Sequence, residues 1–164
     1  MTAIDTLQIV KLPHPALFQV CPYWDFDDSS SVHMAMTASA MIRLCEDSNG
    51  IGLAAPQAAL NQRFFVMRSR PEDEHDHSYL TVVNPKVLIG VSLVTAREGC
   101  LSIPGFVGDV ERMGTIDVEY QNAHGVPIQT SFNGLAARVF QHEKQHLDGK
   151  LFPMVAKKLY RVFV

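Results

Sequence analysis

The sequence predicts an α+β fold in which mostly antiparallel strands pack around a C-terminal metal-binding helix. Two stretches, near residues 29–47 and 133–147, carry apolar residues at helical spacing. Roughly six other stretches have the length and the β-branched or aromatic content of strands. The order of these elements lacks the regular strand–helix–strand alternation of a parallel sheet. Mostly antiparallel strands are therefore expected.

The first predicted helix covers residues 29–47. Asp27 and Asp28 are candidates for its N-cap, and Asn49 with Gly50 ends it. The apolar residues that recur at helical spacing should face the core, and they are Met34, Ala38, Met41, Ile42 and Cys45.

The predicted strands cover residues 7–11, 63–67, 79–83, 86–95, 115–121 and 126–132. Gly90 indicates a bulge or bend within the fourth strand. The last two strands flank the sequence N-A-H-G, residues 122–125, which is typical of a hairpin turn. Residues 68–78, RSRPEDEHDHS, form a polar connector, and a solvated loop is the favoured interpretation of their two histidines.

The second predicted helix begins after Asn133, ends near Leu147 and is closed by Gly149. It contains the pattern H-E-x-x-H, in which His142 and His146 lie about 40° apart on one helical face. Both imidazoles could therefore reach one metal ion.

Glu143 lies to the side of this face, where it could handle a water on the ion but would be a poor third ligand. Leu135 and Val139 precede the histidines on the same face, so the imidazoles should point into the core. A metal ion would relieve the cost of burying two unpaired imidazoles.

The third ligand has to come from another part of the chain. The candidates are Cys100, His124, Asp148 and the loop histidines His75 and His77. Asp148 should face away and His124 should be exposed in its turn. Cys100 lies between a strand-like run and a Pro-Gly bend, where backbone could wrap an ion. A thiolate with two imidazoles suits zinc or ferrous iron and leaves a fourth position open, so Cys100 is favoured, although alone it could be a small buried hydrophobe.

Composition limits the classes of protein to consider. The length of 164 residues fits a single domain spanning residues 1–164, and the net charge of -3 argues against direct nucleic-acid or membrane binding. There is no apolar stretch long enough to span a membrane, and the N-terminus does not resemble a targeting segment. Three cysteines are too few for a disulfide framework, so we expect a cytoplasmic protein. We also expect a monomer.

The stretch GIGLAAPQ, residues 50–57, follows the end of the first helix directly. Its glycines allow backbone to approach a ligand closely, and the amide of Gln57 could donate a hydrogen bond to a carbonyl oxygen. Alone, this stretch could equally be a turn into the next strand.

Together, GIGLAAPQ, EGCLS (residues 98–102) and QHEKQH (residues 141–146) resemble the three signature motifs of the peptide deformylase family, in the same order. The opening LQIVKLPHPAL, the pair Asn84-Pro85 and the SIPG that overlaps EGCLS are also similar to that family. The resemblance implies an α+β metallohydrolase that removes the formyl group from the N-terminal formylmethionine of nascent chains, including those at the ribosome. It also implies ferrous iron as the native metal, replaceable by zinc, nickel or cobalt.

The resemblance carries roles to individual residues. It implies Cys100, His142 and His146 as metal ligands and Glu143 as general base and acid. Gln57 and the backbone N–H of Leu101 would stabilise the oxyanion. By their position beside the motifs, four residues should line an apolar slot for the methionine side chain: Ile51, Gly52, Leu135 and Val139.

Two positions depart from the family pattern. Gln145 stands directly before His146, where an aspartate is usual in the family motif, which changes a partner of the metal ligands. Val107 stands where many relatives carry an arginine that could anchor the substrate main chain. The C-terminal AKKLYRVFV, residues 156–164, should form a short packed helix or strand, with a partner surface as the alternative.

Two other functions remain as alternatives. One is a metal-dependent peptidase that uses the same helix. The other is a non-catalytic protein that binds formylated or capped peptides without turnover.

Overall fold

The computed structural model describes residues 7–163, and it confirms the predicted α+β class. Residues 1–6 of the N-terminal stretch and Val164 lie outside the described residues. Six strands form one antiparallel sheet in the order β1-β2-β3-β4-β5, with β6 paired to β4. The strands are β1 (Gly52–Ala54), β2 (Phe64–Arg68), β3 (Tyr79–Gly99), β4 (Phe106–Gln121), β5 (Pro127–Asn133) and β6 (Lys158–Arg161).

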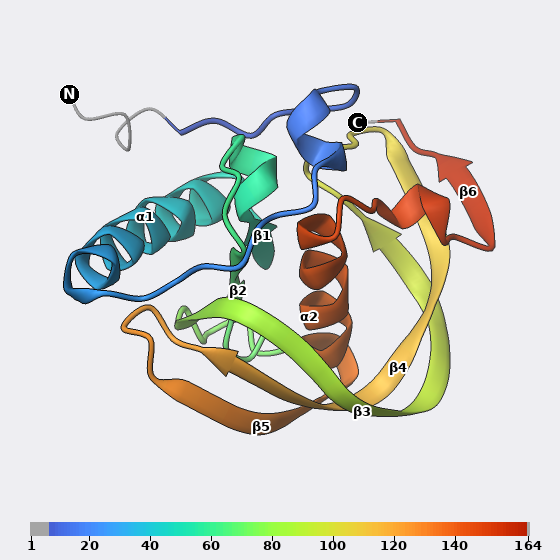
Figure 1. The fold of residues 1–164 in the computed structure, drawn as a ribbon. Coiled ribbons are helices and arrows are strands. Elements are labelled where there is room, and N and C mark those ends of the chain that lie inside the picture. Colours follow the sequence, from blue (N-terminus) through green and yellow to red (C-terminus); the bar gives the residue numbers. More distant parts are fainter. Residues whose placement is uncertain (1–6, 164) are drawn as a thin grey trace.

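Two α-helices and three short 3-10 helices complete the described fold. The elements are α1 (Asp28–Asp47), α2 (Gly134–Leu147), η2 (Pro15–Phe18), η3 (Ala55–Ala58) and η4 (Phe152–Met154). Figure 1 shows α2 in the middle of the molecule, with α1 to one side and the long strands β3 and β4 curving around the other.

Helix α1 begins where the sequence predicts. Asp27 is its N-cap, and the Asp27 carboxylate accepts hydrogen bonds from the backbone N–H groups of Ser29 and Ser30. The predicted apolar stripe is buried, with Ile42 only partly so, and it packs against β1 and β2. This packing holds the segment after the helix, residues 50–57, against the core.

The two strands predicted at residues 79–83 and 86–95 are one continuous strand, β3. The bend expected at Gly90 is misplaced, because the register shifts lie between Val83 and Lys86 and between Val87 and Ile89. Gly90 instead allows a close approach, since a Cβ there would lie 2.6 Å from Cγ of Met113. Strand β4 is also much longer than predicted. In its first half, Asp109 and Glu111 alternate with buried residues, and these charged residues obscured the strand pattern in the sequence.

Residues 7–11 were predicted to form a strand, and this prediction is wrong. The segment reaches distant parts of the chain through separate backbone hydrogen bonds, from Val10 N–H to the carbonyl of Gln57 (2.8 Å) and from Leu12 N–H to that of Ser102 (3.0 Å). The two acceptors belong to different parts of the chain, so the segment does not pair with one strand and no regular series of strand hydrogen bonds forms. These bonds connect η3, which carries Gln57, to the turn that follows Cys100.

Helix α2 occupies its predicted range. Asn133 is at the N-cap, although its side chain makes no capping hydrogen bond, and Gly149 follows the last turn with φ +67°. The buried face of the helix packs on β1, β2, β4 and β5. The residues that form this contact on the helix are Ala136, Ala137, Val139, Phe140 and Leu147.

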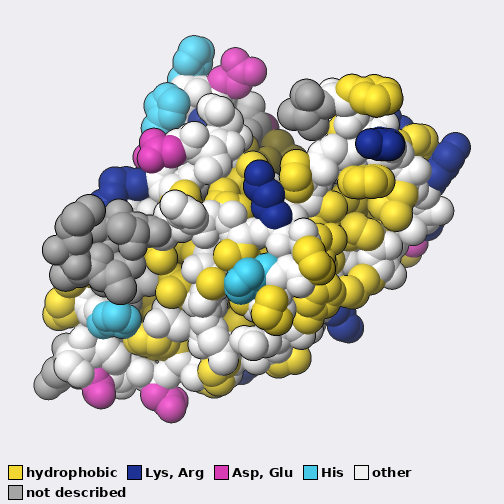
Figure 2. Space-filling model, turned by 90° about the horizontal axis from the view of Figure 1, so that it is seen from above, with side chains coloured by type: hydrophobic (Ala, Val, Ile, Leu, Met, Phe, Trp, Pro, Cys, Tyr) yellow, Lys and Arg dark blue, Asp and Glu magenta, His cyan; other side chains and the backbone are white. Residues whose placement is uncertain are grey.

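The structure also places the hairpin and the C-terminal segment. Residues 122–126 form the hairpin turn, with His124 exposed. The C-terminal segment adds β6 to the free edge of β4, in register from Phe106↔Arg161 to Asp109↔Lys158. Hydrophobic side chains gather on the side of the molecule where β6 lies (Figure 2). Within the described residues, no helix is both long and apolar enough to cross a membrane.

Gly149 provides a test of how tightly α2 is joined to the rest of the fold. A Cβ at Gly149 would lie 2.6 Å from the carbonyl oxygen of Phe18, whereas one at Gly134, also at positive φ, would meet nothing within 4 Å. Gly134→Ala should lower the free energy of unfolding by about 1 kcal/mol through its left-handed conformation alone. Gly149→Ala should lower it by roughly 3 kcal/mol, because backbone must also move. Urea denaturation of both variants measures the difference, and equal losses would contradict the close contact.

Candidate metal centre and active site

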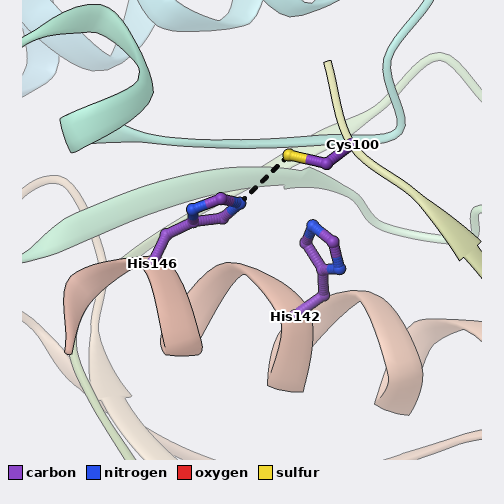
Figure 3. A group of neighbouring side chains, drawn as sticks. All are labelled: Cys100, His142 and His146. Atoms are coloured by element: carbon purple, nitrogen blue, oxygen red, sulfur yellow. Dashed lines mark hydrogen bonds between the residues drawn. The ribbon is translucent and has the colours of Figure 1, made fainter. Parts of the chain in front are cut away.

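Three side chains from two parts of the chain form the centre of the site. His142 and His146 project from successive turns of α2 toward Cys100, which directly follows the end of β3 (Figure 3). Their ligand atoms all lie within 4.8 Å of one another, and Sγ of Cys100 is 3.4 Å from Nε2 of His146. The structure therefore brings together the three residues favoured as ligands.

The orientation of His142 is set by Glu98. Nδ1 of His142 lies 2.9 Å from Oε2 of Glu98, which leaves Nε2 as the atom available to a metal. Glu98 is buried and is also bonded to Arg112 (Nη2–Oε2 2.8 Å) and Arg138 (Nη1–Oε1 2.7 Å). Four charged or titratable side chains from β3, β4 and α2 thus form one largely buried network.

This network is not evident from the sequence. Glu98 stands out there only as part of EGCLS, and the two arginines belong to no motif. Neither Glu98 nor Arg112 lies within a strand that the sequence predicts, so no sequence signal indicated that both charges would be buried and paired.

Glu143 lies at the predicted place beside the ligands, and its side chain is buried. The carboxylate lies against Gly52, where a Cβ would be only 2.7 Å from Oε1. Oε2 is buried and has no hydrogen-bond partner among the described residues. A buried carboxylate oxygen without a hydrogen-bond partner is energetically costly, and such an atom can accept a proton from a water molecule that reacts with the substrate.

Gln57 is held rigidly on η3. Its Oε1 accepts a hydrogen bond from the backbone N–H of Ala54 (2.8 Å). Its Nε2 donates to Oγ of Ser102 (3.2 Å) and to Sγ of Cys100 (3.4 Å). The amide N–H groups therefore point toward the centre, as expected for a donor to a carbonyl oxygen.

A cleft of about 430 Å³ opens onto the centre. All the residues predicted to line the substrate slot lie along it, namely Ile51, Gly52, Leu135 and Val139, and Leu101 and Gln57 line it as well. Val107 is not among its lining residues; it pairs with Gly99 and Tyr160 across neighbouring strands. An exposed arginine is present at the cleft, but it is Arg97 of β3.

The other candidate ligands lie elsewhere. His75, His77 and His124 are exposed. Asp148 forms ion pairs with Arg63 (2.8 Å) and Lys144 (2.8 Å), so both oxygens of its carboxylate are already paired.

Burial and charge together set the protonation of the site. Burial raises the pKa of Glu143 to about 7. Burial also lowers the pKa of His146, which favours the neutral imidazole that a metal needs. Burial alone would lower the pKa of His142, but hydrogen bonds to Cys100 and Glu98 raise it to about 10.

The departure at Gln145 leaves an uncharged side chain beside the ligands. Its Oε1 is buried without a hydrogen-bond partner among the described residues, and so is Nδ1 of His146. The contact with Glu98 orients the ring of His142, and among the described residues His146 has no corresponding partner at its Nδ1.

The donor set fits a divalent metal ion. Ligand atoms around one tetrahedral ion lie roughly 3.3–3.8 Å apart, given bond lengths of about 2.0–2.3 Å. The 3.4 Å separation of Cys100 Sγ and His146 Nε2 already matches this spacing. One thiolate and two imidazoles on rigid elements are ligands that both zinc and ferrous iron accept.

Comparison with known proteins agrees with this geometry. Residues 6–162 match the family model described as Polypeptide deformylase. A curated peptide deformylase of Alkalilimnicola ehrlichii is 39% identical over 156 residues, covering 94% of this chain and 84% of the relative. The crystal structure of the peptide deformylase of Thermotoga maritima superposes with a TM-score of 0.83 at 35% identity, covering 93% of this chain and 98% of that one.

A second similar structure has a ligand. It is a peptide deformylase from Synechococcus elongatus in complex with actinonin, with a TM-score of 0.81 at 32% identity, covering 94% of this chain and 80% of that one.

The Glu98 network predicts a specific pH dependence of stability. Burial by itself raises the pKa of Glu98, but hydrogen bonds to His142 and Arg112 outweigh it and lower the pKa to about 2. A depressed folded-state pKa stabilises the fold above the unfolded value, near 4.5, and this contribution is lost as the pH falls toward 2. Glu98→Gln should therefore be less stable at pH 7 by roughly 3–5 kcal/mol, and the deficit should shrink through this window.

Urea denaturation in a chelating buffer, from pH 7 to about 2.5, measures the deficit without a contribution from metal binding. Glu111→Gln is the matched control, because Glu111 is paired with Lys157 on the exposed part of the same sheet. The control should change stability by less than about 1 kcal/mol at all pH values. A deficit for Glu98→Gln that does not change with pH would contradict the assignment.

Proposed function

The chain belongs to the peptide deformylase family and is an enzyme that removes the formyl group from an N-terminal methionine, and we propose that Cys100, His142 and His146 hold its catalytic metal ion. The observation that carries the proposal is the convergence of one cysteine sulfur and two imidazoles beside a buried carboxylate, next to a cleft. The remaining roles follow from the positions of the side chains around this centre.

We propose ferrous iron as the metal, with zinc, nickel or cobalt able to replace it. The mixed sulfur and nitrogen donors support ferrous iron or zinc, and the family resemblance of the three motifs favours iron. When bound, the ion supplies Lewis-acid chemistry by lowering the pKa of a water and drawing charge from the formyl oxygen.

Glu143 is the proposed proton carrier. Its unpartnered Oε2 accepts a proton from the attacking water as the new C–O bond forms at the formyl carbon. The same carboxyl then gives the proton to the departing amide nitrogen as the C–N bond breaks. The products are formate and a free N-terminal amine, and Glu143 returns to its initial state.

Gln57 and Leu101 are the proposed donors to the oxyanion. Nε2 of Gln57 already points toward Cys100, and its Oε1 is anchored to backbone, so little reorganisation is needed. Leu101 directly follows Cys100 and lines the same cleft, which supports a role for its backbone N–H.

The lining of the cleft supports selection for formylmethionine. Ile51, Leu135 and Val139 provide apolar surface for an unbranched thioether side chain. Gly52 lies so close to Glu143 that any side chain there would displace the carboxylate. A formyl group carries only hydrogen on its carbon, and bulkier acyl groups would be excluded from this space.

We further propose that residues 1–164 act as a single domain and a monomer, in the cytoplasm, on nascent chains at the ribosome. The three cysteines are free thiols, as suits a reducing compartment. The net charge of -3 supports action on the emerging peptide without direct RNA binding.

Metal content tests the ligand set directly. Protein prepared without oxygen should contain about one ion per chain, and Cys100→Ala, His142→Ala and His146→Ala should each lose most of it, because each removes one of only three protein ligands. Elemental analysis gives the readout, with His77→Ala and His124→Ala as controls that should keep the ion. Stoichiometric metal in Cys100→Ala would remove the thiolate from the site.

Glu143→Gln tests the proton carrier. The variant should retain its metal but release formate from formyl-Met-Ala-Ser about 10²–10⁴-fold more slowly, since the amide cannot accept the proton. Glu46→Gln, an exposed position near the end of α1, should leave the rate unchanged. Near-normal turnover in Glu143→Gln would exclude the role.

The same assay separates the alternative functions. The wild-type protein should release formate and free amine in equal amounts and leave the peptide bonds intact. Cleavage of a peptide bond would indicate the metal-dependent peptidase, and binding of the peptide without formate release would indicate the non-catalytic binder.

A further inference from the structure

Arg97 is a charged residue of the cleft that the mechanism above does not use. It lies on β3, three residues before Cys100, and lines the cleft with more than half of its side chain exposed (58%). Unlike Arg112 and Arg138, which are largely buried and paired with Glu98, it is available to a ligand in the cleft.

The guanidinium of Arg97 is held in place from two sides. Its Nε lies 3.2 Å from Oδ1 of Asp109 on β4, and its central carbon lies 4.2 Å from the centre of the Tyr160 ring on β6. The Tyr160 hydroxyl donates to Oδ2 of Asp109 (2.6 Å), so each carboxylate oxygen has a fixed partner. Within the described part of the chain, only Nε of Arg97 is hydrogen-bonded in this cluster, which leaves the two terminal nitrogens to bind an acceptor.

The charge of this cluster remains positive. Lys158 also faces the Tyr160 ring, with Nζ 5.1 Å from the ring centre, so Arg97 and Lys158 together exceed the single charge of Asp109. The C-terminal strand β6 thus supplies the aromatic ring that contacts the guanidinium of Arg97.

The distance from the metal centre selects which part of a substrate Arg97 can reach. A strand rises about 3.3 Å per residue, so the Cα atoms of Arg97 and Cys100 are roughly 10 Å apart. In an extended formyl peptide, the Cα of the third residue lies about 9 Å from the formyl carbon. A formyl group at Cys100 and a peptide running along β3 toward Arg97 would therefore place the third residue level with Arg97.

We propose that Arg97, oriented by Asp109 and Tyr160, makes this enzyme prefer formylmethionyl peptides with an acidic third residue. The inference rests on the proposed function of the site and adds a substrate class to it. A planar guanidinium with free terminal N–H groups fits a carboxylate in a two-point contact. Because the contact is remote from the reacting carbon and equal in the ground and transition states, it should act mainly on KM.

The test uses the metal-loaded enzyme and three peptides with amidated C-termini, formyl-Met-Ala-Glu, formyl-Met-Ala-Gln and formyl-Met-Ala-Lys. Amidation removes the terminal carboxylate, so the side chain is the only variable charge. The wild-type kcat/KM should be about three- to fivefold higher for Glu than for Gln, and roughly tenfold higher for Glu than for Lys. The preference should weaken at high salt and should be smaller when Glu is moved to the second position.

Two variants of Arg97 and one matched control assign the preference to this residue. Arg97→Gln should make the three peptides equivalent while its rate on the Gln peptide stays within a few-fold of wild type. Arg97→Glu should reverse the order. Arg70→Gln is the control, because Arg70 is an exposed arginine bonded through Nε to an aspartate, as Arg97 is, but it lies in the connector before β3 and does not line the cleft.

Tyr160→Leu tests the positioning role of β6 and should reduce the preference without abolishing it. Equal turnover of the Glu and Lys peptides by the wild type, with the Gln peptide deformylated, would overturn the inference and leave the proposed function intact. Retention of the wild-type preference by Arg97→Gln would have the same consequence. Failure of all three peptides to release formate would overturn the proposed function together with the inference.

Discussion

The buried carboxylate of Glu98 is the interaction on which the rest of the site depends. It joins β3, β4 and α2 through contacts with Arg112, Arg138 and His142, and Arg138 also donates to backbone carbonyls of Val94 and Val110. Hydrogen bonds from His142 and Arg112 outweigh the effect of burial on the pKa of Glu98 and keep its carboxylate ionised. The ionised carboxylate then orients His142. The same contacts of Glu98 therefore hold α2 against the sheet and set the geometry of the candidate metal centre.

A second constraint is the close approach of β1 to α2. Gly52 has no side chain, and this allows Glu143 and Val139 to pack directly against the backbone of β1. Burial in this packing raises the pKa of Glu143 to about 7, near the pH at which a general base works best. The glycine that lines the proposed substrate slot therefore also sets the surroundings of the proposed proton carrier.

Two of the candidate ligands come from one helix, and the third comes from a part of the chain that is distant in the sequence. His142 and His146 are fixed by one turn of helix, and any α-helix with this sequence would present them together. Cys100 reaches them only because β3 ends beside α2 and because residues 7–12 hold the loops that carry Gln57 and Ser102 in place. This N-terminal segment makes no strand, but its backbone hydrogen bonds to Gln57 and Ser102 help to hold these two residues beside the candidate metal centre.

By itself, the sequence determined what is local: the two helices and their caps, the hairpin, the H-E-x-x-H face and the three motifs that contain the candidate ligands, Glu143 and Gln57. Helical periodicity and motif spacing encode such features within a few residues. Only the tertiary structure decided that β3 and β4 run so long, that residues 7–11 are not a strand, and that Glu98 organises the centre. It also placed Arg97, and not position 107, at the cleft. These features depend on which strands pair and which charges meet across more than ten residues of chain, and that pairing is a property of the folded sheet and not of any short stretch.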